Sequence, residues 1–244
     1  MRCVITGLIV INLIVVSVFS EPIKVVYFND FAPFSWDDKG EVHGLFKDIA
    51  QEIFSKRLGL TVENKAYPWE RAQRMVIDGT ADVMITTKTN ERMEYAIPGS
   101  MNIFVLNVVA VTYEGHPNLE EMKKFKIISE FKAFIVSDYI GNGWGKTALK
   151  DLNVRMFPDV RSCLRILAEK NADVHFTSPQ IVRYFSSQYI FKSKLSVLPA
   201  VYDQLEFFVF IGKKSRYVND IYRVNDAIGR MYKDGTMKSI YQRY

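Results

Sequence analysis

The sequence predicts an α/β protein of two similarly built lobes, and three observations lead to this prediction. Short apolar runs alternate with segments of helical periodicity through residues 23–87, which favours a parallel sheet covered by helices. A helix-then-strand unit at 71–87 is followed by a similar unit at 161–178, and both contain Ala-Asp-Val. Two longer apolar runs, at 103–111 and 205–211, are long enough to connect one lobe with the other.

The composition is that of an ordinary globular protein. Of the 244 residues, 48% are hydrophobic and 24% are charged, and the formal net charge is +5. These values argue against a disordered, collagen-like or coiled-coil chain. The basic residues form no block, so we expect no nucleic-acid partner. The length allows a sizeable core, and we expect a monomer.

The first elements follow from apolar spacing. Residues 23–28 form an apolar run typical of a buried strand, and 29–40 is predicted to be a loop rich in aromatic residues. Apolar side chains then recur at helical spacing from Leu45 to Leu58, and Gly59 ends that predicted helix.

The next unit continues the alternation. Residues 60–65 are predicted to be a strand. Pro68 opens a helix at its first turn, where proline is tolerated, and Gly79 ends it. A third strand is predicted at 81–86.

The second half repeats this pattern. A strand is predicted at 133–136, followed by a glycine-rich turn at 141–145 and a helix that runs through Leu149. Another helix is predicted to begin at Pro158, and 172–176 reads as a further short strand.

The two long apolar runs set the predicted boundaries. If they connect the lobes, the C-terminal helices at 218–232 and 237–244 return to the first lobe. We therefore expect a first lobe of 23–104 plus 207–244 and a second lobe of 105–206, rather than one continuous sheet. A cleft between two α/β lobes is a preferred place for a small ligand.

The N-terminus predicts export. Residues 3–19 carry no charge, follow Arg2 and end in the small-residue exit at Ser20. This pattern is typical of a cleaved secretory signal peptide at 1–20, and the alternative is an uncleaved membrane anchor.

Metal and catalytic patterns are missing from the sequence. His43, His116 and His175 show no metal-ligand spacing, so we expect no metal and no cofactor. Cys3 falls in the signal segment, which leaves Cys163 without an internal disulfide partner. No nucleophile elbow, phosphate loop or C-x-x-C motif is present. We therefore expect that the protein is not an enzyme.

Four motifs occur in an order and spacing that resemble one protein family. They are 31–35 before Gly40 and Gly44, 68–72 before Gly79 and 81–82, 87–92 before 95–98, and 233–236 before 240–241. Together they resemble the extracytoplasmic, or periplasmic, solute-binding proteins of ABC transporters, in family 3, which binds polar amino acids. The resemblance spans essentially the whole chain after the predicted signal segment.

The resemblance implies a fold and a function. It implies the type II periplasmic-binding-protein fold, with a ligand cleft between two lobes that close by a hinge motion. It also implies a periplasmic protein that binds a small polar solute, such as an amino acid or related carboxylate. The closed form would then deliver the solute to an inner-membrane ABC permease.

Nine residues are candidate ligand contacts. They are Phe31, Trp69, Arg71, Thr86, Thr87, Arg92, Asn142, Trp144 and Ser178. The resemblance assigns Phe31 and Trp69 to opposite flat walls of the cleft, although both could be ordinary packing residues. For Arg71 the sequence leaves two places open, the cleft and the helix surface.

Arg92 is the predicted anchor for a carboxylate. Its guanidinium offers a planar fork of donors that fits a carboxylate, and Thr86 and Thr87 could add hydroxyl donors. The alternative for Arg92 is a surface salt bridge to Glu91 or Glu94.

The second lobe supplies weaker candidates. The turn at 141–145 precedes a helix, so its backbone N–H groups could bind an anion near Asn142 and Trp144. Ser178 stands where the family often has an aspartate that holds the ammonium group of the ligand. This departure puts the identity of the solute in doubt.

Two other functions stay open. A small hydratase or dehydratase could use the same scaffold, and it would need a carboxylate or histidine in the cleft. A ligand-sensing module for a membrane receptor would look the same in sequence, and only its partner would distinguish it.

Overall fold

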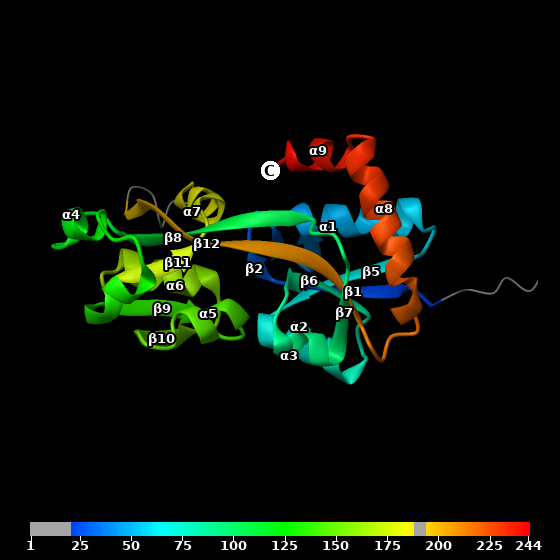
Figure 1. The fold of residues 1–244 in the computed structure, drawn as a ribbon, viewed down its shortest axis with the longest axis horizontal. Helices are drawn as coiled ribbons and strands as arrows, with labels where there is room; N and C mark the ends of the chain where they lie inside the picture. Colours follow the sequence, from blue (N-terminus) through cyan, green and yellow to red (C-terminus); the bar gives the residue numbers. More distant parts are fainter. Residues whose placement is uncertain (1–20, 188–193) are drawn as a thin grey trace, which may run out of the picture.

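The computed structural model describes residues 21–187 and 194–244. The predicted signal peptide at 1–20, and its alternative as an anchor, lie outside the described residues. Within the described part, no helix is both long enough and apolar enough to cross a lipid bilayer. Two α/β bodies lie next to each other along the long axis of the molecule (Figure 1), and these are the first and second lobes.

The first lobe is built on three parallel strands. They are β1 (Ile23–Phe28), β5 (Val62–Tyr67) and β6 (Val83–Thr87). Its helices are α1 (Leu45–Ala50), α2 (Trp69–Asp78), α3 (Asn90–Tyr95), α8 (Ile221–Lys233) and α9 (Thr236–Tyr241). β1 lies between β5 and β6, and five of its six side chains are buried. The predicted strands are present here, with bounds shifted by a few residues.

Local sequence sets the ends of the first helices. α2 begins directly after Pro68 and ends at Gly79, whose φ of 80° lies in the left-handed region that favours glycine. The helix predicted from Leu45 to Leu58 is also present. Its second half, Gln51–Arg57, is wound as a π-helix.

The aromatic segment at 29–40 is not the loop that was predicted. It contains β2 (Asp30–Phe31) and β3 (Ser35–Asp38), which form a small antiparallel sheet with β4 (Glu41–His43). The Ser35 hydroxyl donates to the Phe28 carbonyl at 2.8 Å, which fixes this sheet to the end of β1. Phe31 and Phe34 of this segment are buried, whereas Trp36 is half-buried and stacks on His43 at 5.6 Å.

The second lobe repeats the plan of the first. Its parallel strands are β9 (Ile135–Tyr139), β10 (Asn153–Phe157) and β11 (Val174–Thr177). Its helices are α4 (Leu119–Met122), α5 (Gly143–Ala148), α6 (Val160–Ala168) and α7 (Pro179–Ser186), with a 3-10 segment at Ile128–Ala133. The sequence did not predict β10, because this edge strand has no buried residue and so no apolar run.

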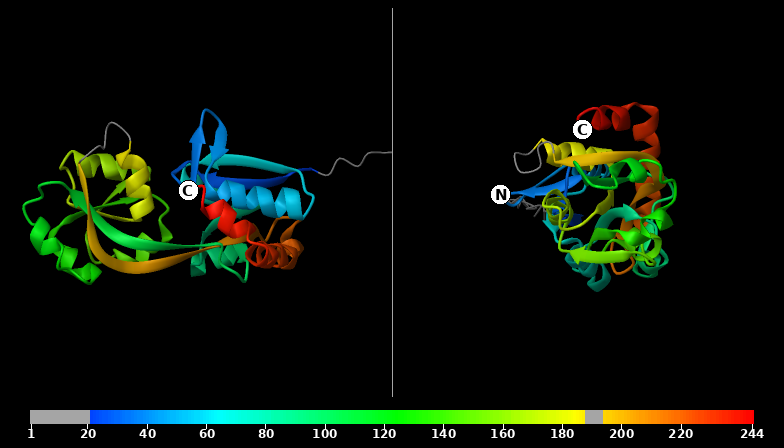
Figure 2. Two further views of the ribbon diagram at one scale, coloured as in Figure 1. Left: turned by 90° about the horizontal axis from the view of Figure 1, so that it is seen from above. Right: turned by 90° about the vertical axis from the view of Figure 1, so that its left-hand side faces the viewer.

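Two long antiparallel strands connect the lobes. β8 (Phe104–Tyr113) and β12 (Leu195–Gly212) pair from Phe104 opposite Phe207 to Tyr113 opposite Leu195. A short β7 (Ala96–Pro98) also pairs with β12. Seen from above, these two strands bridge two separate bodies (Figure 2).

The strands nevertheless form one hydrogen-bonded ladder, which corrects the expectation of two separate sheets. The order is β10-β9-β11-β8-β12-β6-β1-β5. The ladder is continuous because β8 and β12 stay paired through the connection. Because the ladder has no break between the lobes, it marks no boundary, and the boundaries 23–104 plus 207–244 and 105–206 remain a prediction.

The C-terminal helices pack on the first lobe. α8 contacts the π-helical segment Gln51–Arg57, and α9 contacts α1. Arg57 holds this end of the chain through an ion pair with Asp234 at 2.8 Å and a hydrogen bond to Thr236 at 2.9 Å. A 3-10 turn at Val218–Asp220 leads into α8.

Candidate functional site

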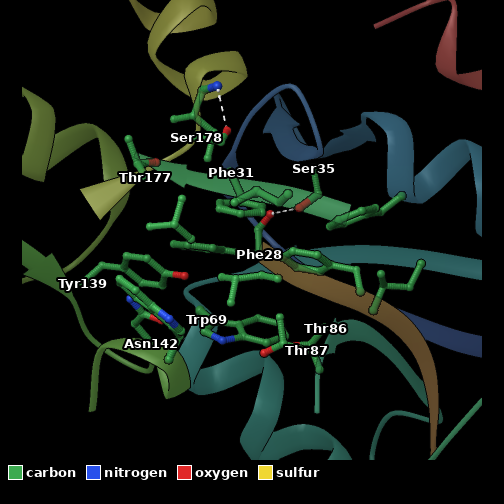
Figure 3. A pocket seen from close by; sticks show the side chains of 18 of the residues that line it. Phe28, Phe31, Ser35, Trp69, Thr86, Thr87, Tyr139, Asn142, Thr177 and Ser178 are labelled. Atoms are coloured by element: carbon green, nitrogen blue, oxygen red, sulfur yellow. Dashed lines mark hydrogen bonds between the residues drawn. The ribbon is translucent and has the colours of Figure 1, made fainter. Parts of the chain in front are cut away.

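A cavity lies between the lobes where four parallel strands end. β1 ends at Phe28, β6 at Thr87, β9 at Tyr139 and β11 at Thr177, and all four residues line the cavity. Figure 3 shows their side chains gathered around one space. The empty space in it is about 730 Å³, which includes solvent at its open mouth. We call this space the interlobe cavity.

Aromatic residues are the largest group in the walls of the interlobe cavity. Nine of the 21 lining residues have aromatic rings: Tyr27, Phe28, Phe31, Phe46, Trp69, Tyr139, Trp144, Phe176 and Phe207. The rings of Phe28 and Phe31 stack at 5.9 Å, and Phe28 reaches across to Tyr139 of the second lobe at 5.2 Å. Such walls favour a ligand with a flat or apolar body.

Arg92 lines the cavity and is held in one position by its neighbours. Its Nε donates to Gln73 Oε1 at 3.0 Å, and its Nη1 donates to Thr87 Oγ1 at 2.8 Å. Its Nη2 lies 3.5 Å from the carbonyl oxygen of Gly141 in the second lobe. The Thr87 hydroxyl therefore accepts from Arg92 and positions it, and its own hydrogen stays available for the predicted role as a donor to a ligand.

The Arg92 guanidinium is a buried cation that makes no ion pair with an acidic side chain of the described residues, and Glu91 acts on it only through charge at a longer distance. Arg92 is only 4% exposed, and burial lowers the pKa of the guanidinium. Glu91 pairs with Lys146 at 3.0 Å instead, and Glu94 makes no ion pair with Arg92 within the described chain. Because a buried charge is costly without a counter-charge, this wall favours an anionic group on the ligand.

The glycine-rich turn of the second lobe is built on Asp138. The Asp138 carboxylate accepts from Asn142 Nδ2 at 2.8 Å and from the Tyr139 N–H at 2.9 Å. A side chain at Gly145 would collide with that carboxylate, so glycine is required there. Burial raises the pKa of Asp138 to about 6, and the hydrogen bonds from Asn142 and Tyr139 oppose the shift.

This turn presents a carbonyl to the first lobe. The oxygen of Gly141 accepts from Gln73 Nε2 at 3.3 Å and faces Arg92. The N–H of Asn142 is already bonded within the turn to the Tyr139 carbonyl at 3.2 Å. The Asn142 N–H is therefore not free for a ligand, and an anion site made of the other backbone N–H groups of this turn stays a prediction.

Ser178 and Trp144 occupy the remaining second-lobe wall. Ser178 is fully buried and caps α7, since its Oγ accepts from the Ile181 N–H at 3.2 Å. The Trp144 indole N–H donates to Asp203 at 2.7 Å. Both side chains line the interlobe cavity.

Direct contacts also join the lobes around the cavity. The Asp30 carboxylate accepts from the Arg161 backbone N–H at 3.0 Å and from its Nε at 3.2 Å. On another side, Glu91 pairs with Lys146. The structure is therefore a form in which the two lobes touch.

Eight of the nine sequence candidates line the interlobe cavity, and Arg71 does not. The eight are Phe31, Trp69, Thr86, Thr87, Arg92, Asn142, Trp144 and Ser178. Arg71 is exposed on α2, where its guanidinium lies over the Tyr67 ring at 4.6 Å. The helix turns it outward, which resolves the choice that the sequence left open.

Sequence reasoning missed several wall residues. Phe28 ends the predicted strand 23–28, so the rule that ligands bind at the carboxyl ends of strands could have found it. Tyr139 ends β9 three residues beyond the strand predicted at 133–136, so the predicted bounds did not point to it. Gln73 does not line the cavity but holds Arg92. It follows Trp69 by one helical turn, which places both on one face of α2. Phe207 lies in an apolar run that gives no such signal.

The described residues were compared with the requirements of a metal site and of an acid or base in the cavity. No group of three or more possible metal-ligating side chains occurs within 21–187 and 194–244. No histidine or carboxylate is among the described residues that line the interlobe cavity. His175 lies buried in β11, where its Nδ1 and the Ser137 carbonyl are 2.8 Å apart, and burial lowers its pKa to about 4.

Comparison with protein families gives one result for the whole described chain. The model for bacterial extracellular solute-binding proteins, family 3, matches residues 23–244. Comparison with curated protein sequences finds no match.

Solved structures share the fold. A mutant of the arginine-binding protein ArgBP from T. maritima is 19% identical, with a TM-score of 0.77 over 91% of this chain and 94% of its own. The arginine-, lysine-, histidine-binding protein ArtJ from Geobacillus stearothermophilus is 19% identical, with a TM-score of 0.77 over 92% and 95%. An ancestral amino-acid-binding protein, a precursor of cyclohexadienyl dehydratase, is 20% identical, with a TM-score of 0.72 over 91% and 95%.

Proposed function

The chain belongs to the bacterial extracellular solute-binding proteins of family 3, and from that premise we propose that it binds one small carboxylate-bearing solute between its lobes. We further propose that it acts in the periplasm and delivers the solute to an inner-membrane ABC permease. The observation that supports the carboxylate is Arg92, a buried cation in the cavity wall whose hydrogen-bond acceptors are all neutral.

Arg92 keeps donor capacity for a ligand. Its Nη2 carries two hydrogens and has one weak contact, to the Gly141 carbonyl at 3.5 Å. A carboxylate oxygen at this nitrogen supplies the missing negative charge. Gln73 and Thr87 hold the guanidinium in place beforehand, so little side-chain entropy is lost when the solute binds.

Closure of the two lobes is favoured because both lobes contribute residues to the wall of the cavity. Trp69 and Phe31 belong to the first lobe, and Tyr139 and Ser178 to the second. A solute that touches both sets gains contacts only when the lobes come together, so it shifts the equilibrium towards the closed form. A permease could then distinguish the closed form from the open one.

A thermal-shift screen of purified 21–244 tests the proposal. The panel holds small carboxylates, amino acids and amines. A ligand at 100 times its dissociation constant stabilises the protein by about 2.7 kcal/mol. Small-angle scattering should show a smaller radius of gyration when a stabilising compound is bound. If only amines without a carboxylate stabilise the protein, the carboxylate proposal is wrong.

The dehydratase alternative has one likeness in its favour, because one structural neighbour is a precursor of cyclohexadienyl dehydratase. An acid or base for that reaction has no carboxylate or histidine candidate among the described wall residues. Incubation of each hit with the protein, followed by mass spectrometry of the solute, separates the two functions. Conversion of the solute would favour the enzyme.

A further inference from the structure

The interlobe cavity provides a cation for the solute but no anion. Its polar wall residues, apart from Arg92 and the tyrosine and tryptophan rings, are Ser35, Thr86, Thr87, Asn142, Thr177 and Ser178. All six are neutral. None of the described residues that line the cavity is acidic. Asp30, Asp138, Glu91 and Asp203 are carboxylates of segments that border it.

Two of these carboxylates are engaged by the second lobe. Asp30 accepts two hydrogen bonds from Arg161, one from the backbone and one from the side chain. Asp138 is 2% exposed and lies behind Asn142, whose amide it accepts. Neither residue lines the interlobe cavity.

The other two carboxylates line a neighbouring hollow that shares Thr87, Trp144 and Leu205 with the interlobe cavity. Asp203 accepts the indole N–H of Trp144 at 2.7 Å. Glu91 pairs with the Lys146 ammonium at 3.0 Å. These four carboxylates are therefore already bonded to donors of the protein.

We propose that the solute is a carboxylate with an apolar or aromatic body and no free amino group. This inference rests on the proposed function. An α-ammonium group would leave water for a cavity without a counter-charge, and the fixed guanidinium of Arg92 would repel it. Removal of the amino group takes away both penalties, and the aromatic walls still bind the body.

Matched pairs that differ only in the amino group test this inference. The pairs are 3-phenylpropanoate with phenylalanine, indole-3-propanoate with tryptophan, 4-methylpentanoate with leucine, and glutarate with glutamate. Isothermal titration calorimetry on purified 21–244 should give at least tenfold tighter binding of the acid in the best-binding pair. Tenfold corresponds to about 1.4 kcal/mol.

Substitution of Ser178 by an acid should restore the missing anchor. In Ser178→Asp, one carboxylate oxygen can still cap α7 at the Ile181 N–H, because Asp is as good an N-cap as Ser. The other oxygen adds a negative charge to the wall. Ser178→Asn is the matched control, since it also caps a helix and has the same shape without the charge.

The expected result is a change in preference that depends on charge. Ser178→Asp should shift the acid-to-amine affinity ratio at least tenfold towards the amino acid, and Ser178→Asn should leave the acid preferred. Equal or tighter binding of the amino acids by the unmodified protein overturns the inference and leaves the proposed function standing. Failure of both members of every pair to bind overturns the inference and counts against the carboxylate function as well.

Discussion

The two lobes contribute different kinds of wall to the same cavity. The first lobe supplies stacked aromatic rings and Arg92, which its own residues Gln73 and Thr87 hold still. The second lobe supplies a glycine-rich turn and a helix cap above buried titratable groups, Asp138 and His175. The difference suggests that the first lobe recognises the body and charge of the solute. The second lobe would then select against a solute with an amino group, and its buried groups would make the stability of the protein depend on pH.

The largest effect is expected from the first-lobe cation. Replacement of Arg92 by Met should weaken binding of an acidic solute by about a hundredfold or more, since hydrogen bonds to charged groups contribute about 1.5–3 kcal/mol each. Arg92→Lys should also weaken it, because a compact ammonium cannot bond Gln73 and Thr87 as the planar guanidinium does and still offer a donor to the solute. Calorimetry gives the affinities, and circular dichroism checks the fold.

Arg71 offers a matched control for Arg92. It is also an arginine of the first lobe, but it lies exposed over Tyr67 and outside the cavity. Arg71→Met should leave the affinity within twofold. If Arg92→Met binds as tightly as Arg71→Met with the fold intact, the first lobe does not recognise charge and the contrast between the lobes fails.

The second effect concerns His175 in the second lobe. Its pKa is lowered from 6.5 to about 4 by burial, so the unfolded chain binds the proton more tightly. The stability that neutral His175 contributes is present above pH 6.5 and is lost as the pH falls towards 4. A shift of this size corresponds to roughly 3 kcal/mol.

Asp138 acts with the opposite sign in the same pH range. Its pKa is raised from 3.8 to about 6, so the folded chain binds the proton more tightly. Stability is greatest below pH 3.8 and falls as the pH rises to 6, by roughly 3 kcal/mol. The two groups therefore offset each other between pH 4 and 6.

Single substitutions should separate the two opposing pH dependences of the free energy of unfolding. Compared with the unmodified protein, His175→Asn should lose less stability on going from pH 7 to pH 4, by roughly 3 kcal/mol. Asp138→Asn should lose more stability by a similar amount. Urea unfolding at pH 4, 5, 6 and 7 measures both. If the free energy of unfolding changes with pH in the same way in all three proteins, His175 and Asp138 are not a pair of groups with opposing effects on stability.

The sequence predicted the fold more completely than the site, for a physical reason. Strand and helix periodicity is a local signal, so β1, α2 and β6 could be located within a few residues. The resemblance to the family then pointed to Trp69 and Arg92. Which donors and acceptors those side chains use depends on contacts from distant parts of the chain, such as the Gly141 carbonyl, and no local pattern encodes them.

The continuous ladder of strands is a second feature that local sequence patterns could not predict. The long apolar runs predicted a connection between the lobes, but their mutual pairing depends on register between segments that are about 90 residues apart in sequence. Likewise, the aromatic segment at 29–40 looked like a loop because its strands have only two to four residues. Such short strands are stabilised by packing against β1, which periodicity does not report.

The smallest effect is expected where the lobes touch each other directly. Asp30 is 9% exposed and accepts two hydrogen bonds from Arg161. Burial raises its pKa, and Arg161 opposes that rise. Asp30→Asn keeps one acceptor but removes the charge, so the closed form should become less populated and the apparent affinity should fall about three- to tenfold.

The Glu91–Lys146 pair is the matched comparison for Asp30. It also joins the lobes, but its side chains are 65% and 61% exposed, and exposed ion pairs contribute little because water screens them. Glu91→Gln should therefore leave the affinity within twofold, as calorimetry at moderate ionic strength would show. If Glu91→Gln weakens binding as much as Asp30→Asn does, net charge across the mouth controls closure. If neither changes affinity, the solute alone holds the lobes together, and the aromatic wall of the first lobe must supply most of the closing contacts.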